Sequence, residues 1–517
     1  MLTPFRNEPY VDFTQPEPRR RMEEALREVS GQLGLTYPLI IGGERVSTER
    51  TIVSTNPARP SQVVGRVACA DGALADRAIQ AAWAAFADWS RTPAEVRARC
   101  LIKAAAILRR RIYEFSAWLT LEVSKSWIEA YADVAEAIDF LEFYGREMMR
   151  LGGAHPTTPF PGEENEVRYL PLGVGASISP WNFPLAIMAG MTSAAVVTGN
   201  AVITKPASQA PVVAAKFFEV LEEASIPAGV ANYLPGPGGE MGDALTDHPR
   251  TRFVSFTGSK EIGIRIFERA ARVQPGQKWL KRTILEMGGK DAILVDADAD
   301  LDAAADAVVA SAFGYQGQKC SACSRLIAHA QVYDALLERV VDRAAQLTVG
   351  DPADPGTFMG AVIDAGARRK IEEYIAIGRS EGRIVLGGEG GLPESEGHFV
   401  RPTIVADVSP GARLAQEEVF GPVLAVIRAR SFAEGIEIAN GTEFGLTGAA
   451  FSRNRAHLEL ARREFHVGNL YLNRKCTGAL VDVQPFGGFN MSGTDSKAGG
   501  RDYLQLFMQA KSIAERF

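Results

Sequence analysis

The 517-residue sequence is poor in cysteine and has no long apolar run, and both scarcities exclude kinds of protein. Five cysteines in so long a chain do not make a disulfide framework, so we expect a cytoplasmic protein whose thiols stay reduced. No run reaches the ~18 apolar residues of a membrane span; the nearest, 186–199, is interrupted by glycine and threonine. The start, MLTPFRNEPYVDF, lacks the basic and apolar blocks of a secretory signal.

Basic residues are not in excess either. Lysine and arginine total 56 against 62 aspartate and glutamate, which gives a net charge of −6. A mildly acidic surface argues against binding to nucleic acid or to an anionic membrane. The six histidines are scattered and none forms a His-x-x-Cys pattern, so we expect no metal site.

The chain is longer than one compact core accommodates, so we expect two or more domains. Apolar stripes at helical spacing occur in 72–90, 94–123 and 133–150, and a proline-rich break follows at 154–165. Beyond the break, short β-rich runs such as 173–180, 200–206 and 252–259 alternate with helical patterns such as 211–224 and 261–271, and the alternation resumes from 291 to 347. It predicts parallel sheets with helices on both faces, in two α/β domains.

The most informative stretch is FGYQGQKCSACSR, residues 313–325, in which Cys320 and Cys323 stand three apart. This spacing is typical of a redox dithiol, of half a zinc site, or of one nucleophile beside a bystander. A dithiol needs a small thioredoxin-like domain and a zinc site needs a second ligand pair, and the sequence has neither. A single nucleophile, Cys320, is therefore favoured, with Cys323 as a small buried side chain one turn along. A helix beginning there would lower the pKa of the thiol.

Two stretches suggest ligand binding at the ends of strands. In FTGSKEIG, 256–263, Gly258 follows a strand and leads into a helix, whose free N–H groups suit a pyrophosphate. Lys205 ends another strand, at the edge where α/β sheets bind ligands. Taken alone, a tight turn without a ligand explains Gly258 equally well, and a surface lysine is the better explanation of Lys205.

Two further residues have side chains that can serve catalysis. Glu286 stands near the glycine pair of LEMGGKDA and can act as a general base if burial raises its pKa. Asn182, in PWNFP, can donate its side-chain amide to a developing oxyanion. A solvated turn carboxylate and a turn asparagine are the plainer explanations of each residue alone.

The order of these motifs resembles the NAD(P)-dependent aldehyde dehydrogenase superfamily, from about residue 37 to the C-terminus. The motifs are PWNFP, TKPAS, FTGSKEIG, LEMGGK, GQKCSA, EEVFGPV (417–423) and PFGGFNMSG (485–493). One branch, the 1-pyrroline-5-carboxylate dehydrogenases, is resembled more closely through ADVAEAIDF (132–140), GQKCSACSR and EFHVGNLYLNRKCTGALV (464–481).

This resemblance implies an α/β fold with a Rossmann-type cofactor domain, a second α/β catalytic domain and a small β oligomerisation element. The NAD(P)-binding domain would comprise 1–155 and 172–285, the catalytic domain 286–483, and the oligomerisation element and C-terminal tail 156–171 and 484–517. It also implies a homo-oligomer, a dimer or dimer-based hexamer, in which a β-hairpin around 156–171 pairs with the partner.

The resemblance also implies roles for individual residues. Cys320 would be the nucleophile, Asn182 with the Cys320 N–H the oxyanion hole, and Glu286 the base for hydrolysis. Residues that would bind the cofactor, NAD or NADP, are Lys205 and Ser208 near the adenosine ribose, Gly258 and Ser259 at the pyrophosphate, and Glu418 and Phe420 at the nicotinamide riboside. Residues that would bind the substrate are Ser321, Gly478 and Ala479 at its α-carboxylate, Phe183 and Phe486 along its aliphatic chain, and Glu136 nearby.

The implied reaction is the oxidation of L-glutamate γ-semialdehyde, formed from 1-pyrroline-5-carboxylate, to L-glutamate, the second step of proline catabolism, through a thioester on cysteine. The alternatives are a dehydrogenase of another aldehyde or semialdehyde, including a CoA-acylating one, and a thiol–disulfide oxidoreductase.

Two departures from the family pattern matter. Many NAD-preferring relatives carry glutamate at the position of Ser208, so NADP stays possible, and Met287 replaces a leucine of similar volume.

Overall fold

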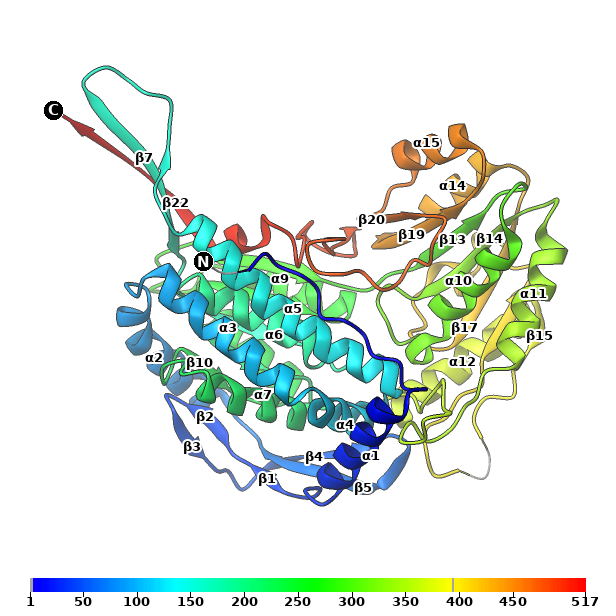
Figure 1. Cartoon of the computed structure of the whole chain (residues 1–517), viewed down its shortest axis with the longest axis horizontal. Coiled ribbons are helices and arrows are strands. Elements are labelled where there is room, and N and C mark those ends of the chain that lie inside the picture. Colours follow the sequence, from blue (N-terminus) through cyan, green and yellow to red (C-terminus); the bar gives the residue numbers. More distant parts are fainter. Residues whose placement is uncertain (1–2, 393–394) are drawn as a thin grey trace.

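The computed structural model describes residues 3–392 and 395–517, which fold around two seven-stranded sheets (Figure 1). In the first sheet, the central strands pair in parallel and β2 and β3 extend one edge in antiparallel fashion. Its strands, in spatial order, are β12 (Arg282–Glu286), β11 (Phe253–Thr257), β8 (Val174–Ile178), β9 (Ala201–Lys205), β10 (Ala231–Tyr233), β2 (Leu39–Ile41) and β3 (Glu44–Val46).

Helices cover both faces of this sheet, as the alternation of patterns predicts. On β9, Val202 points into a core that includes α6 (Ala186–Val197) and α7 (Pro211–Glu223). Its neighbours Ala201 and Ile203 point into a second core, with α2 (Gly72–Trp89) and α8 (Gly238–Asp247). Because successive side chains of a strand alternate between faces, a strand buried on both sides is largely apolar, as Ala201–Ile203 are.

The chain leaves β8 toward β9 and β10 and then crosses to β11 and β12 on the other side. The crevice outside the carboxyl ends of strands at such a reversal is where α/β sheets bind ligands. The loops after β8 and β11 flank this crevice.

The second sheet has the same construction. Its strands, in spatial order, are β15 (Arg383–Leu386), β16 (Thr403–Ala406), β17 (Val423–Ala429), β14 (Cys323–His329), β13 (Asp291–Val295), β19 (Thr447–Phe451) and β20 (Asn469–Leu472). One face packs against α10 (Leu301–Phe313) and α11 (Tyr333–Ala345). The other packs against α12 (Ala365–Glu381), α14 (Phe432–Asn440) and α15 (Arg455–Glu464). The two predicted α/β units are present, whereas the division at 285/286 stays a prediction.

The N-terminal helices differ from the predicted ones. The single helix expected over 94–123 is wrong: α3 (Ala94–Arg110) and α4 (Ile112–Val123) meet at Arg111, whose φ of −99° and ψ of 16° interrupt the helix. Arg111 holds this break by pairing with Glu114 and Glu219. The helix expected at 133–150 begins earlier, as α5 (Trp127–Leu151), and the helix α1 (Pro16–Ser30) was not anticipated.

Three antiparallel strands project from the body of the molecule (Figure 1). They are β6 (His155–Pro156), β7 (Glu163–Pro171) and β22 (Met508–Arg516), and β7 pairs with β22 from Pro171 opposite Met508 to Glu163 opposite Arg516. A smaller sheet joins β1 (Thr36–Tyr37), β5 (Arg59–Ala68) and β4 (Thr51–Asn56). Across the described residues, we find no helix with the length and apolar character needed to cross a membrane.

Candidate active site

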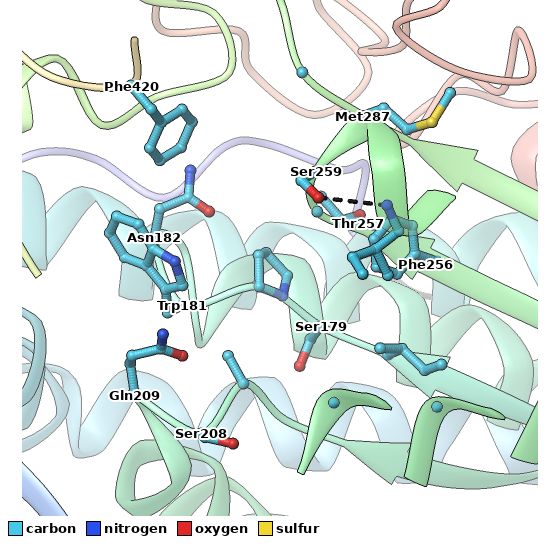
Figure 2. A pocket seen from close by; sticks show the side chains of 18 of the residues that line it. Ser179, Trp181, Asn182, Ser208, Gln209, Phe256, Thr257, Ser259, Met287 and Phe420 are labelled. Atoms are coloured by element: carbon cyan, nitrogen blue, oxygen red, sulfur yellow. Dashed lines mark hydrogen bonds between the residues drawn. The ribbon is translucent and has the colours of Figure 1, made fainter. Parts of the chain in front are cut away.

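A cavity of about 560 Å³ lies in the crevice at the carboxyl edge of the first sheet. Its lining comes from the loops after β8, β9, β11 and β12 and from residues near 418–420 (Figure 2). Cys320 also lines it. All six predicted cofactor-binding residues line it: Lys205, Ser208, Gly258, Ser259, Glu418 and Phe420. The position of this cavity, which we call the nucleotide cavity, is the one at which α/β sheets bind dinucleotides.

The N-terminus of α9 (Lys260–Ala271) opens onto the nucleotide cavity. Ser259 caps this helix, its Oγ accepting a hydrogen bond from the Ile262 N–H at 3.4 Å. Gly258 precedes it at a place where a Cβ atom would stand 2.5 Å from the Phe256 ring. Free N–H groups and the positive end of the helix dipole attract a phosphate here.

Lys205 is buried at the end of β9, as the sequence predicts for the strand end. Its Nζ donates a hydrogen bond to the Pro206 carbonyl at 3.0 Å, and burial lowers the pKa of Lys205 to about 8. Ser208 lines the same part of the cavity, beside Gln209 (Figure 2). This arrangement places an ammonium and a neutral hydroxyl in the wall of the cavity.

Glu418 and Phe420 stand at the end of the nucleotide cavity nearer Cys320. Glu418 Oε1 accepts a hydrogen bond from the Gly289 N–H at 2.9 Å, and a Cβ on Gly288 would lie 2.5 Å from the other carboxylate oxygen. This contact explains Gly288, and a Cβ on Gly289 would stand 2.4 Å from the Cys320 carbonyl oxygen. Phe420 meets Trp181 edge to face, with ring centroids 5.5 Å apart.

Cys320 lines the nucleotide cavity and also a second cavity of about 150 Å³, which we call the substrate cavity. The helix predicted to begin at Cys320 is wrong, because the residue lies in a turn between a short 3₁₀ segment, Gly314–Gly317, and β14. The predicted lowering of the thiol pKa is also wrong: burial, with the carboxylates of Asp291 and Glu286, raises the pKa of Cys320 well above its usual range. A thiol in this setting needs a base to take its proton.

Hydrogen bonds from distant segments fix the turn before Cys320. Tyr315 and Gln316 have φ values of 49° and 56°, which side-chain-bearing residues adopt only when surrounding contacts compensate. The Tyr315 hydroxyl donates to the Val123 carbonyl at 3.0 Å. The Gln316 amide donates to the carbonyls of Ser124, at 3.1 Å, and Ala361, at 2.8 Å.

Asn182 lies beside this turn, 5% exposed, and its Nδ2 donates to the Gln318 carbonyl at 3.0 Å. Because a primary amide carries two N–H donors, this bond orients the side chain and leaves one donor for another acceptor. Asn182 and Cys320 both line the nucleotide cavity. An oxyanion formed at a carbon bonded to Cys320 is a suitable acceptor for that donor.

Glu286 ends β12 and lines the substrate cavity with Cys320. Its Oε1 accepts a hydrogen bond from the Ser496 hydroxyl, and its buried Oε2 has no partner among the described residues. Burial raises the pKa of Glu286 to about 8, and the Ser496 bond opposes that rise. This shift meets the condition set for Glu286 as a general base, because the carboxylate is suited to exchange protons near neutral pH.

The six predicted substrate-binding residues come together in the substrate cavity, although they are far apart in sequence. They are Glu136, Phe183, Ser321, Gly478, Ala479 and Phe486. Gly478 has a φ of 76°, a conformation that favours glycine. Gly478 brings no side chain to the wall of the cavity, and its neighbour Ala479 brings only a methyl group.

Several residues of the cavity wall were not anticipated from the sequence. Lys319 Nζ pairs with Glu129 at 2.6 Å, and both line the substrate cavity. Behind Phe183, the fully buried Lys125 pairs with Asp133 at 2.8 Å and places its ammonium 3.7 Å from the centre of the Phe183 ring. The signal available in the sequence was the seven-residue spacing of Glu129 and Glu136. It is close to two helical turns and places both side chains on one face of a helix.

The second cysteine of the motif, Cys323, has the surroundings of a core residue. Cys323 is 1% exposed and begins β14, so it does not lie one helical turn from Cys320 as predicted. Its thiol donates to the Arg325 carbonyl at 3.4 Å, and it shares a core with Cys476. All five cysteines are free thiols.

Comparisons with known proteins agree with this geometry. The aldehyde dehydrogenase family model matches residues 45–513. A 1-pyrroline-5-carboxylate dehydrogenase of Geobacillus thermodenitrificans is 62% identical over 517 residues, with both chains fully covered. The structure of a 1-pyrroline-5-carboxylate dehydrogenase from Thermus with bound NAD is 56% identical, with a TM-score of 0.98 and both chains fully covered. A proline utilization A from Bdellovibrio bacteriovorus is 43% identical over 99% of this chain and 53% of its own, with a TM-score of 0.96.

The half-buried thiol of Cys320 between two cavities, the Glu286 carboxylate in one of them and the match across most of the sequence lead to one assignment. The chain belongs to the aldehyde dehydrogenase family.

Proposed function

We propose that this protein oxidises L-glutamate γ-semialdehyde to L-glutamate with NAD, the second step of proline catabolism. The observation that supports this most is the position of Cys320, which faces the nucleotide cavity and the substrate cavity at once. The relatives at 62% and 56% identity over the full chain are 1-pyrroline-5-carboxylate dehydrogenases.

The nucleotide cavity fits NAD by the chemistry of its donors. The α9 N-terminus suits the pyrophosphate, Lys205 and Ser208 suit the adenosine ribose, and Glu418 suits the second ribose. Gly258 and Ser259, at the N-terminal end of α9, line the cavity, so a ligand can approach the main chain there. When bound, NAD supplies the hydride acceptor.

In our proposal, the residues of this chain carry the remaining chemistry. Solvent takes the proton of the Cys320 thiol, and the thiolate adds to the aldehyde carbon. The free N–H of Asn182 and the Cys320 backbone N–H stabilise the oxyanion of this tetrahedral adduct. After hydride loss, Glu286 accepts a proton from the water that hydrolyses the Cys320 thioester.

Selectivity follows from the polar groups of the substrate cavity. We propose that the Ser321 hydroxyl and the backbone of Gly478 and Ala479 bind the α-carboxylate. Phe183 and Phe486 flank the aliphatic chain. An aldehyde without the carboxylate leaves these buried donors unpaired, at a cost of ~1–3 kcal/mol each.

We also propose that the protein is a homo-oligomer of the cytosol, a dimer or a dimer-based hexamer. Two observations support self-association. The strands β7 and β22 project from the body with Phe160 62% exposed at the tip. On α9 and in the segment after it, Phe267 and Leu280 are 54% and 77% exposed. Analytical ultracentrifugation tests this, and a monomer at micromolar concentration would contradict it.

An NADH-formation assay over a panel of aldehydes tests the proposed function. We expect L-glutamate γ-semialdehyde to have the highest kcat/KM and the Cys320→Ala variant to be inactive, because no other group in the two cavities can form the thioester. Equal kcat/KM for hexanal and for L-glutamate γ-semialdehyde would contradict the substrate assignment. Activity retained in Cys320→Ala would contradict the mechanism. Cys323→Ser should remain active, and its inactivity would favour a dithiol enzyme instead.

A further inference from the structure

The N-terminal segment of residues 3–14, which we call the arm, lies against the substrate cavity. It runs along α5 before it reaches α1 (Figure 1). The arm lies before residue 45, where the match to the family model begins. The arm therefore lies outside the part of the chain that matches the family model.

Hydrogen bonds anchor the arm to two walls of the substrate cavity. The Asn7 side-chain amide donates to Asp139 on α5 at 2.9 Å and to the Val481 carbonyl at 3.0 Å. The Glu8 N–H donates to the other oxygen of Asp139 at 2.7 Å. Val481 ends the loop that carries Gly478 and Ala479, so one asparagine joins the helix wall to the loop wall.

Aromatic contacts fix the far end of the arm. Phe13 meets Trp127 and Tyr131 of α5 edge to face, at centroid distances of 5.4 Å and 5.9 Å. Asn7 and Phe13 thus hold the chain on both sides of Tyr10. The position of Tyr10 is set by these anchors rather than by its own packing, since its side chain is 60% exposed.

Tyr10 lines the substrate cavity at its acidic side. Residues 129, 132, 136, 140 and 144 of α5 form the facing wall, at the spacing of one helical face. Glu129 on that wall is paired with Lys319, while burial raises the pKa of Glu136 to about 8. A cation bound beside Glu136 would stabilise its ionised form, and the α-ammonium of an amino-acid aldehyde is such a cation.

The geometry points to Tyr10 as a specificity-determining residue whose ring closes the substrate cavity over the α-amino end of the substrate. This inference rests on the proposed function. With the α-carboxylate at the loop of Gly478, the α-nitrogen lies toward the acidic wall. The Tyr10 ring then leaves room for a free ammonium and excludes a nitrogen that carries an acyl group.

The test compares L-glutamate γ-semialdehyde with its N-acetyl derivative, both assayed with NAD. In the wild type we expect the free amino acid to be preferred. Tyr10→Ala should raise kcat/KM for the N-acetyl aldehyde relative to the free one by about tenfold, the scale of steric discrimination in an enzyme pocket. Tyr10→Phe keeps the ring and should keep the wild-type ratio. Asn7→Ala removes the bond to the Val481 carbonyl and one of the two bonds to Asp139, and it should change the ratio in the same direction as Tyr10→Ala.

The matched control is Asp12→Ala in the same arm, because Asp12 hydrogen-bonds only its neighbours Thr14 and Gln15 among the described residues. It should leave the ratio unchanged, and the KM for NAD should be the same in all variants. A ratio within twofold of wild type in folded Tyr10→Ala would overturn the inference. An equal change in Tyr10→Phe would also overturn it. Absence of wild-type activity on L-glutamate γ-semialdehyde would instead refute the proposed function, so the two failures are distinguishable.

Discussion

The hydroxyl of Ser496 donates a hydrogen bond to Oε1 of Glu286 from a position 210 residues later in the chain. The segment that carries Ser496 also holds the end of β12 by backbone pairing, since the Met287 N–H donates to the Ser492 carbonyl at 2.7 Å. One oxygen of the candidate base is thereby fixed, and the other is left facing the substrate cavity.

Ser496→Ala should shift the pH dependence of turnover toward higher pH. The raised pKa of Glu286, about 8, means that the ionised base is lost as the pH falls through that value. The hydrogen bond stabilises the ionised form, and its loss, worth about 1.5–3 kcal/mol, raises the pKa by about 1–2 units. Steady-state NADH formation at pH 7.5 should fall about tenfold or more and recover at higher pH.

Thr494→Ala is the matched control for this variant. The Thr494 hydroxyl accepts from the Leu285 N–H at 3.0 Å, so it supports the same strand without touching the carboxylate. Its pH profile should coincide with that of the wild type. A Ser496→Ala profile with an unchanged midpoint would show that the serine has only a structural role.

Glu286→Gln should form one equivalent of NADH per active site and then stall. The amide cannot accept a proton from water, so hydrolysis of the thioester slows by about 10²–10⁴-fold. Rapid-mixing absorbance at 340 nm measures the burst and the later rate. Steady turnover at a rate near that of the wild type would refute the role of Glu286 in hydrolysis.

Ser208→Glu should discriminate against NADP. The side chain at position 208 faces the part of the nucleotide cavity where Lys205 lies, and a carboxylate there opposes a 2′-phosphate. We expect the KM for NADP to rise about tenfold or more, because like charges side by side cost several kcal/mol. Ser208→Ala, which adds no charge, should leave both cofactors' KM values nearly unchanged. Equal KM changes for NAD and NADP in Ser208→Glu would contradict this placement.

Lys125→Met should destabilise the protein by about 3–5 kcal/mol, because it leaves the carboxylate of Asp133 buried without its partner. Urea unfolding measures this loss. The double variant Lys125→Met/Asp133→Asn should recover part of the stability, since asparagine can still accept from the Ala186 N–H that Asp133 now binds. No recovery would show that the ion pair is not the source of the effect.

The strand and helix alternation could be predicted because it depends on local apolar patterns. On β9 and β13 every residue is buried, which matches their nearly continuous apolar sequences. The surroundings of Cys320 could not be predicted in the same way. Tyr315 and Gln316 adopt positive φ values because groups at 123–124 and 361 bind them, and no local pattern encodes those contacts.

The prediction that the substrate-binding residues lie together came from the family resemblance and not from their spacing in the sequence. Gly478 and Phe183 are nearly 300 residues apart, and neither is distinctive alone. Ser496 and Tyr10 were missed because each acts through a partner that is remote in sequence. The thiol pKa was predicted with the wrong sign, since the sequence does not reveal that Asp291 and Glu286 surround the sulfur.

Among the described residues, the two cavities share only Thr257 and Cys320 in their linings. We therefore expect the carboxylic acid and the reduced dinucleotide to leave by separate routes, so that either can dissociate while the other stays. Inhibitors that fill one cavity should be noncompetitive toward the ligand of the other cavity. A compound that extends through both cavities past the Cys320 sulfur should compete with both ligands.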